Sequence, residues 1–131
     1  VSDTNEAFAK YLGRKKPCYV PMRTIPTNDA ANIIKRSGGI PVVSHPVHYK
    51  MSTPNYVQFF TLLKTFGIKG IEAIHSDNKP DDEQQFKAMA DSLDMIITGG
   101  SGFCGMLRPD INLGTGKGNL MIPQSMLNDL R

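Results

Sequence analysis

The chain has 131 residues, a length at which one compact domain buries roughly two thirds of the surface of its unfolded state. Its composition, 40% hydrophobic and 21% charged, is that of a globular protein and excludes disordered and collagen-like classes. The net charge is only +3 and the basic residues are interspersed with acidic ones, which argues against a nucleic-acid-binding module.

The cysteine content and the hydropathy of the sequence indicate the cellular compartment of the protein. Cys18 and Cys104 lie far apart without metal-like spacing, and no disulfide framework is expected. No apolar run reaches the roughly 18 residues that would span a bilayer, and no signal segment opens the chain. We therefore predict a cytoplasmic protein without membrane contact. Because the chain begins at Val1 and a helical pattern follows almost at once, we expect the natural protein to extend further toward its N-terminus.

Capping residues and apolar spacing divide the chain into short elements. Asp3 and Glu6 have the spacing of a capping box and predict a helix that ends at Gly13. A proline-rich stretch, 15–26, is predicted to be an extended connector. Further helices are predicted over 28–37, 54–66, 80–93 and 123–130, with Thr27 and Thr53 as N-caps of the first two. Apolar runs at 40–44, 68–74, 95–98 and 120–122 alternate with them.

Continuous apolar runs are typical of parallel strands that are buried on both faces, and their alternation with helices predicts successive βα units. The predicted fold class is therefore α/β with a parallel sheet. In such folds the functional site forms where the strands end at their carboxyl side.

The carboxyl ends of three predicted strands are the places to look for metal-binding or catalytic side chains. His45 follows the first, and as a neutral imidazole it could bind a transition metal or serve as a hydrogen-bonded structural residue. Glu72 and His75 belong to the second, where their odd spacing sends them to opposite faces unless the strand ends between them. The third leads into a glycine-rich loop. The tract 114–118 lacks the spacing of a phosphate-binding loop and predicts a turn.

Several short motifs occur in a fixed order along the chain: Gly38-Gly39-Ile40-Pro41-Val42-Val43-Ser44-His45-Pro46 with Tyr49, Gly70-Ile71-Glu72, Thr98-Gly99-Gly100-Ser101, Arg108-Pro109 and Leu113-Gly114. In order and spacing they resemble the C-terminal half of PHP-domain (polymerase and histidinol phosphatase) phosphoesterases. Within this family, the chain most resembles the subgroup of small PHP enzymes that act on nucleoside phosphates and short oligoribonucleotides. In that subgroup a helical insertion ends with a segment similar to residues 5–21.

The resemblance implies a distorted, TIM-like (β/α)7 barrel. Residues 1–26 would be the end of the helical insertion plus the connector, and residues 27–131 the C-terminal part of the barrel. It also implies a cluster of divalent metals, manganese, zinc or iron, that activates water and neutralises phosphate oxygens. His45 corresponds to the metal-binding histidine of the family's His-Pro motif. Arg108 and His75 are expected to contact substrate.

The chain also departs from the family pattern. It has no counterpart of the N-terminal His-x-His motif. The last metal motif, Ser-Asp-Phe-His-Gly in the family, is here Ser101-Gly102-Phe103-Cys104-Gly105. Gly102 has no side chain with which to bind a metal, whereas Cys104 could bind a soft metal as thiolate.

Two hypotheses follow. In the first, the chain is the C-terminal part of a metal-dependent phosphoesterase, inactive by itself, that associates with the N-terminal half of the barrel or with itself and acts on a phosphate ester or short oligonucleotide. In the second, it is a catalytically dead PHP homologue with a binding or regulatory role and no metal of its own.

Overall fold

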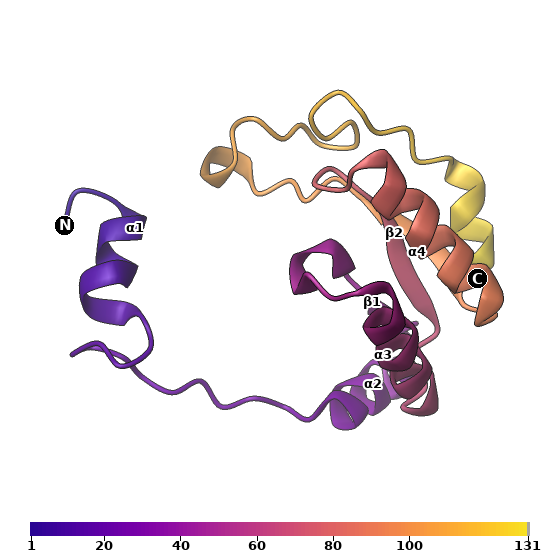
Figure 1. Ribbon diagram of the computed structural model, residues 1–131, viewed down its shortest axis with the longest axis horizontal. Helices are drawn as coiled ribbons and strands as arrows, with labels where there is room; N and C mark the ends of the chain where they lie inside the picture. The colour runs from indigo at the N-terminus through magenta and orange to yellow at the C-terminus, as the bar shows by residue number, and fades with distance from the viewer. Residues whose placement is uncertain (131) are drawn as a thin grey trace.

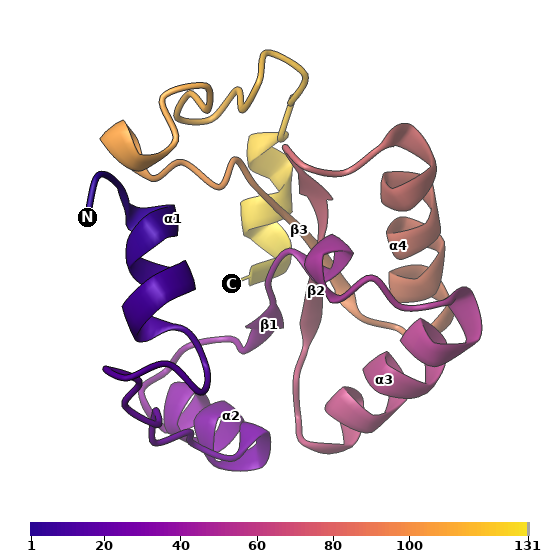
Figure 2. The same ribbon diagram turned by 60° about the vertical axis from the view of Figure 1, so that its left-hand side comes forward.

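A three-stranded parallel sheet lies at the centre of the computed structural model, which describes residues 1–130. The strands β1 (Val42–Val43), β2 (Gly70–His75) and β3 (Ile96–Gly100) are neighbours in that order. Helix α3 (Thr53–Thr65) connects β1 to β2, and α4 (Pro80–Ser92) connects β2 to β3 (Figures 1 and 2). The predicted α/β class with successive parallel βα units is confirmed.

Shorter elements flank this sheet. They are α1 (Thr4–Ala7), η1 (Phe8–Leu12), α2 (Thr27–Arg36), η2 (Pro46–Tyr49), η3 (Gly105–Leu107) and η4 (Gln124–Leu130). Near the N-terminus the Asp3 side chain accepts the Glu6 N–H, as its spacing predicts. Thr27 and Thr53, predicted as N-caps, are instead the first residues of α2 and α3.

The predicted strand at 120–122 is wrong, because these residues form no strand. Ile122 instead packs on β3, where a Cβ added to Gly99 would lie 3.0 Å from the Ile122 Cγ1 atom. Pro123 follows directly and has no N–H to donate to a sheet. The last predicted helix is the 3-10 element η4.

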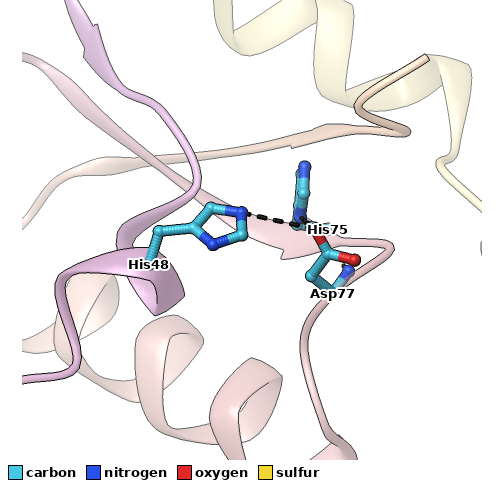
Figure 3. A group of neighbouring side chains, drawn as sticks. All are labelled: His48, His75 and Asp77. Carbon is cyan, nitrogen blue, oxygen red and sulfur yellow. Dashed lines mark hydrogen bonds and ion pairs between the residues drawn. The ribbon is translucent and has the colours of Figure 1, made fainter. Parts of the chain in front are cut away.

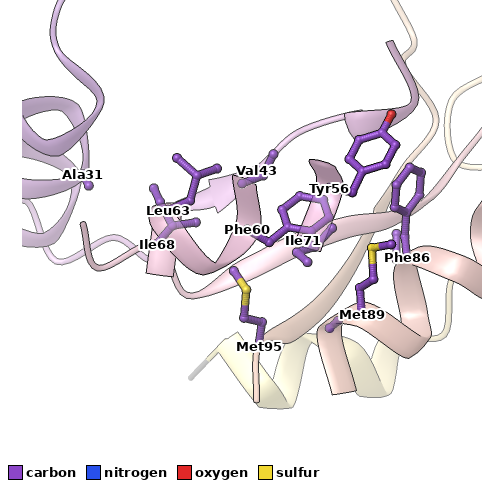
Figure 4. Close-up of a cluster of buried hydrophobic side chains, with 12 residues drawn as sticks. Ala31, Val43, Tyr56, Phe60, Leu63, Ile68, Ile71, Phe86, Met89 and Met95 are labelled. Atoms are coloured by element: carbon purple, nitrogen blue, oxygen red, sulfur yellow. The ribbon is translucent and has the colours of Figure 1, made fainter. Parts of the chain in front are cut away.

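The hydrophobic core lies between the sheet and the helices α3 and α4 (Figure 4). Phe60 of α3, Ile71 of β2 and Phe86 of α4 are almost completely buried there. The rings of Phe60 and Phe86 meet edge to face, with centroids 6.2 Å apart. This packing holds the crossover helices α3 and α4 against the sheet.

The N-terminal segment stands apart from this core. Figure 1 shows α1 and η1 at a distance from the sheet, joined to α2 by a long extended connector. Neither α1 nor η1 contains a buried residue. Within the described part of the chain, no helix is both long and apolar enough to cross a membrane.

Candidate functional site

The first site residue, His45, follows β1 in a strained backbone conformation. Its φ of 33° lies in the left-handed region, which non-glycine residues rarely adopt. The backbone N–H of His45 donates a hydrogen bond to the Glu72 Oε2 atom at 2.6 Å. Strain of this kind persists only where surrounding contacts hold it, and it is concentrated at functional sites.

His48 is brought beside His45 by the 3-10 turn η2. The His48 N–H donates to the His45 carbonyl oxygen at 3.1 Å, and side chains three residues apart eclipse one another in this helix type. The centroids of the two imidazole rings are 5.1 Å apart. On the far side of the turn, the buried hydroxyl of Tyr56 donates to the Pro46 carbonyl oxygen at 2.9 Å and ties the turn to α3.

His75, the last residue of β2, completes a triangle of imidazoles. Its ring centroid is 5.8 Å from that of His45 and 5.7 Å from that of His48. His75 is only 2% exposed, whereas the other two histidines are exposed. Burial lowers the pKa of His75 below its ordinary value, which favours the neutral ring.

Asp77 lies just after β2 and is a centre of charge pairing (Figure 3). Its carboxylate accepts two hydrogen bonds from Arg108, at 2.9 and 3.0 Å, and one from Lys117 at 2.9 Å. The hydrogen bonds from Arg108 and then from Lys117 hold the pKa of Asp77 far below its usual range. Its Oδ2 atom is also 3.3 Å from the His48 Nε2 atom and 3.9 Å from the His75 Nδ1 atom.

Glu72 and His75 both reach His45, although their odd spacing suggests opposite faces of the strand. Strand pairing between β2 and β3 shifts register between Glu72 and Ile74, so the strict alternation of side chains does not hold through this point. Glu72 contacts the backbone of His45, and His75 approaches its ring.

The metal ligands that the family pattern implies at positions 102 and 104 are not brought together in this structure. Gly102 has φ of 68°, and a Cβ added to it would lie 2.7 Å from the His75 Nε2 atom, so the His75 ring takes the room of a side chain at this position. Cys104 is exposed and lies outside the one group of potential metal ligands found in residues 1–130, which consists of His48, His75 and Asp77. The family ligand set therefore does not fit this chain.

A cleft of about 600 Å³ opens beside His75. It runs along α4, where Lys79, Glu83 and Lys87 line it, and Asn119 closes its other side. Of the three histidines only His75 lines the cleft, which therefore offers space for a ligand next to that residue.

Of the sequence-predicted site residues, the structure brings His45, His75 and Arg108 to the carboxyl end of the sheet, and Cys104 to the loop beyond it. Sequence reasoning missed His48 and Asp77. The His-x-x-His spacing of His45 and His48 could have suggested a turn that pairs them, but nothing in the sequence announces the pairing of Asp77 with Arg108, 31 residues away.

Comparisons with known proteins agree with this picture. No protein-family model matches the chain. A 3',5'-nucleoside bisphosphate phosphatase of Chromobacterium violaceum is 31% identical over 103 residues, which are 79% of this chain and 36% of that protein. A 5'-3' exoribonuclease of Haemophilus influenzae is 28% identical over 116 residues, 86% of this chain and 42% of that protein. The chain thus spans well under half the length of these curated relatives.

Two solved structures share the fold. A Chromobacterium violaceum protein described as an amidohydrolase superposes with a TM-score of 0.65 at 31% identity, over 79% of this chain and 36% of that one. A Bifidobacterium adolescentis protein described as a metal-dependent phosphoesterase gives a TM-score of 0.70 at 23% identity, over 96% of this chain and 43% of that one.

The parallel sheet and its crossover helices form part of a TIM-like α/β fold, with the imidazoles gathered at the carboxyl end of the sheet. Within that class the relatives confirm the resemblance seen in the motifs: the chain is homologous to phosphoesterases of the PHP type over most of its length.

Proposed function

We propose that this chain is the C-terminal part of a PHP-type phosphoesterase whose complete form hydrolyses phosphate esters of nucleotides or short oligoribonucleotides in the cytoplasm. Relatedness to a nucleoside bisphosphate phosphatase and to an exoribonuclease supports the substrate class. The observation that supports the proposal is the convergence of the rings of His45, His48 and His75 at the carboxyl end of the sheet. His75 also lines a cleft to which Lys79 and Lys87 contribute.

The isolated chain is expected to be inactive. It lacks the half of the barrel that carries the family's first metal motif, and Gly102 supplies no ligand to the last one. The test is an assay of an aryl phosphate, a nucleoside 3',5'-bisphosphate and a short oligoribonucleotide with the 131-residue chain, in the presence of manganese, zinc or iron. We expect no enzyme-like turnover. Robust turnover that disappears in His45→Ala would show that the chain is a complete catalyst.

A second function, binding or regulation by a catalytically dead homologue, is favoured by one observation, the absence of a side chain at position 102. The two functions differ in the longest natural form of the protein. Hydrolysis of the same three substrates by that form supports the enzyme. Nucleotide binding without hydrolysis supports the binding role.

A further inference from the structure

We propose that the N-terminal arm, residues 1–26, is a binding site for single-stranded RNA, in which exposed aromatic rings stack on bases and a basic turn at residues 14–16 contacts phosphates. This inference deepens the proposed function and rests on it for its biological use, because such an arm would favour oligoribonucleotides over single nucleotides. Binding to the arm, however, can be measured without any hydrolysis.

The net positive charge of the chain is confined to the arm. Residues 1–26 contain five basic and two acidic residues, a net charge of +3, which equals that of the whole chain; residues 27–131 are balanced, with ten of each sign. Figure 1 shows that the arm stands apart from the sheet. The interspersed charges that argue against a nucleic-acid-binding module therefore describe residues 27–131, whereas the arm has a local excess of positive charge that attracts polyanions.

The acidic residues of the arm do not neutralise its basic turn. The Asp3 side chain accepts the backbone N–H of Glu6, and the Glu6 carboxylate pairs with Lys10. Residues 14–16, by contrast, are exposed and form no ion pair within residues 1–130. Lys15 has φ of 68°, a conformation that non-glycine residues rarely adopt and that is concentrated at functional sites.

Local hydrogen bonds hold two aromatic residues on either side of this turn. The Lys16 N–H donates to the Gly13 carbonyl oxygen at 2.9 Å, and the Tyr19 N–H donates to the Lys16 carbonyl oxygen at 3.0 Å. The Cys18 N–H donates to the Tyr11 carbonyl oxygen, also at 3.0 Å. The chain therefore folds back through the basic turn, with Tyr11 before it and Tyr19 after it.

The aromatic side chains of the arm are exposed. Phe8 is 56% exposed, Tyr11 45% and Tyr19 40%, and neither helical element of the arm contains a buried residue. Exposed aromatic rings beside positive charge are the common feature of proteins that bind single strands without sequence preference, because every base has a face that can stack. A single-stranded oligonucleotide supplies several such faces together with phosphates. A single nucleotide supplies one base, and a duplex keeps its base faces stacked inside.

The experiment measures the fluorescence anisotropy of a labelled six-nucleotide oligoadenylate that is titrated with the 131-residue chain in EDTA, which removes the metals that hydrolysis would need. We expect Tyr11→Leu and Tyr19→Leu each to weaken binding by about 5- to 100-fold, the loss that follows from removing one stacked base. Leucine keeps apolar area but has no aromatic face. Tyr11→Phe is the matched control, which keeps the ring and should bind like the parent chain.

Salt dependence tests the basic turn. Each phosphate contact with a single strand contributes a slope of about −0.7 to the plot of log affinity against log salt concentration. Replacing Lys15 and Lys16 together by alanine should therefore make the slope shallower by about 1.4. Replacing Lys35 and Arg36, an exposed basic pair of α2, should leave it unchanged.

The proposal is overturned if the folded parent chain does not bind the oligoadenylate, or if Tyr11→Leu binds it as tightly as Tyr11→Phe. Equal loss of affinity in the Lys35 and Arg36 variant and in the Lys15 and Lys16 variant would also overturn it. If Tyr11→Leu loses self-association and not RNA binding, the rings belong to a protein interface and the proposal is wrong. Circular dichroism confirms the fold of each variant. Hydrolysis of oligoadenylate by the complete protein, with a KM that Tyr11→Leu does not change, would refute the role of the arm and leave the proposed function intact.

Discussion

At the scale of single residues, the site depends on where the backbone leaves regular structure. His45 is held at positive φ by the carboxylate of Glu72, and Gly102 adopts positive φ beside the buried ring of His75. The sequence predicts that His45 and His75 lie at strand ends, because apolar runs locate those ends. It does not predict their mutual approach, since this follows from a register shift and a 3-10 turn that leave no clear sequence pattern.

Replacing Gly102 by alanine should destabilise the protein more than the same change at Gly105. Both glycines have positive φ, a conformation that costs other residues about 1–2 kcal/mol. Only at Gly102 would the new Cβ also meet the His75 ring, whereas nothing lies within 4 Å of a Cβ at Gly105. Urea denaturation of the two variants measures the difference. Equal losses of unfolding free energy would show that the His75 ring moves away without cost.

At the scale of elements, local signals locate the helices well. Pro54 and Pro80 lie in the first turns of α3 and α4, as predicted, and Gly67 follows the end of α3 with φ of 87°. Prediction fails at 120–122, because an apolar run becomes a strand only if a neighbouring strand can pair with it. That condition depends on the tertiary fold. The predicted division at residue 26 stays a prediction.

Tyr56→Phe should loosen the turn that carries His48. The buried Tyr56 hydroxyl is bonded to the Pro46 carbonyl, and leaving that oxygen without a partner costs about 1–3 kcal/mol. We expect this loss of unfolding free energy together with a shift of the His45 and His48 ring resonances in NMR spectra. Tyr49→Phe is the control, since Tyr49 is 44% exposed and its hydroxyl makes no hydrogen bond in residues 1–130. Equal stability of the two variants would contradict the role given to Tyr56.

At the scale of the whole molecule, the chain leaves much apolar surface uncovered. Met106, Leu107, Leu113 and Met121, all in the segment after β3, are each at least 76% exposed. Both outer strands of the sheet also lack a further strand beside them in the described part of the chain. Soluble proteins avoid open sheet edges and large apolar patches, so we expect this surface to lie against another chain segment.

We therefore expect the isolated chain to self-associate, or to copurify with the N-terminal half of the barrel when the two are produced together. Light scattering at tens of micromolar measures the first outcome, and affinity purification of a tagged chain the second. Replacing Met106 and Leu107 by serine should reduce self-association, because it removes apolar area without touching the core. If the parent chain remains a folded monomer, the outer strands and the apolar surface of the sheet need no second chain to cover them.

The extended connector shown in Figure 1 sets the order in which a protease would attack the molecule. Arg14, Lys15 and Arg23 are exposed trypsin targets, and no hydrogen bond of residues 1–25 reaches beyond residue 25 in the described chain. The segment after β3 is equally irregular, but Arg108 and Lys117 fasten it to Asp77. Brief trypsin treatment followed by mass spectrometry should release the first helix before it cuts between residues 101 and 122. Early cutting in the latter segment would mean that the Asp77 pairs do not restrain it in solution.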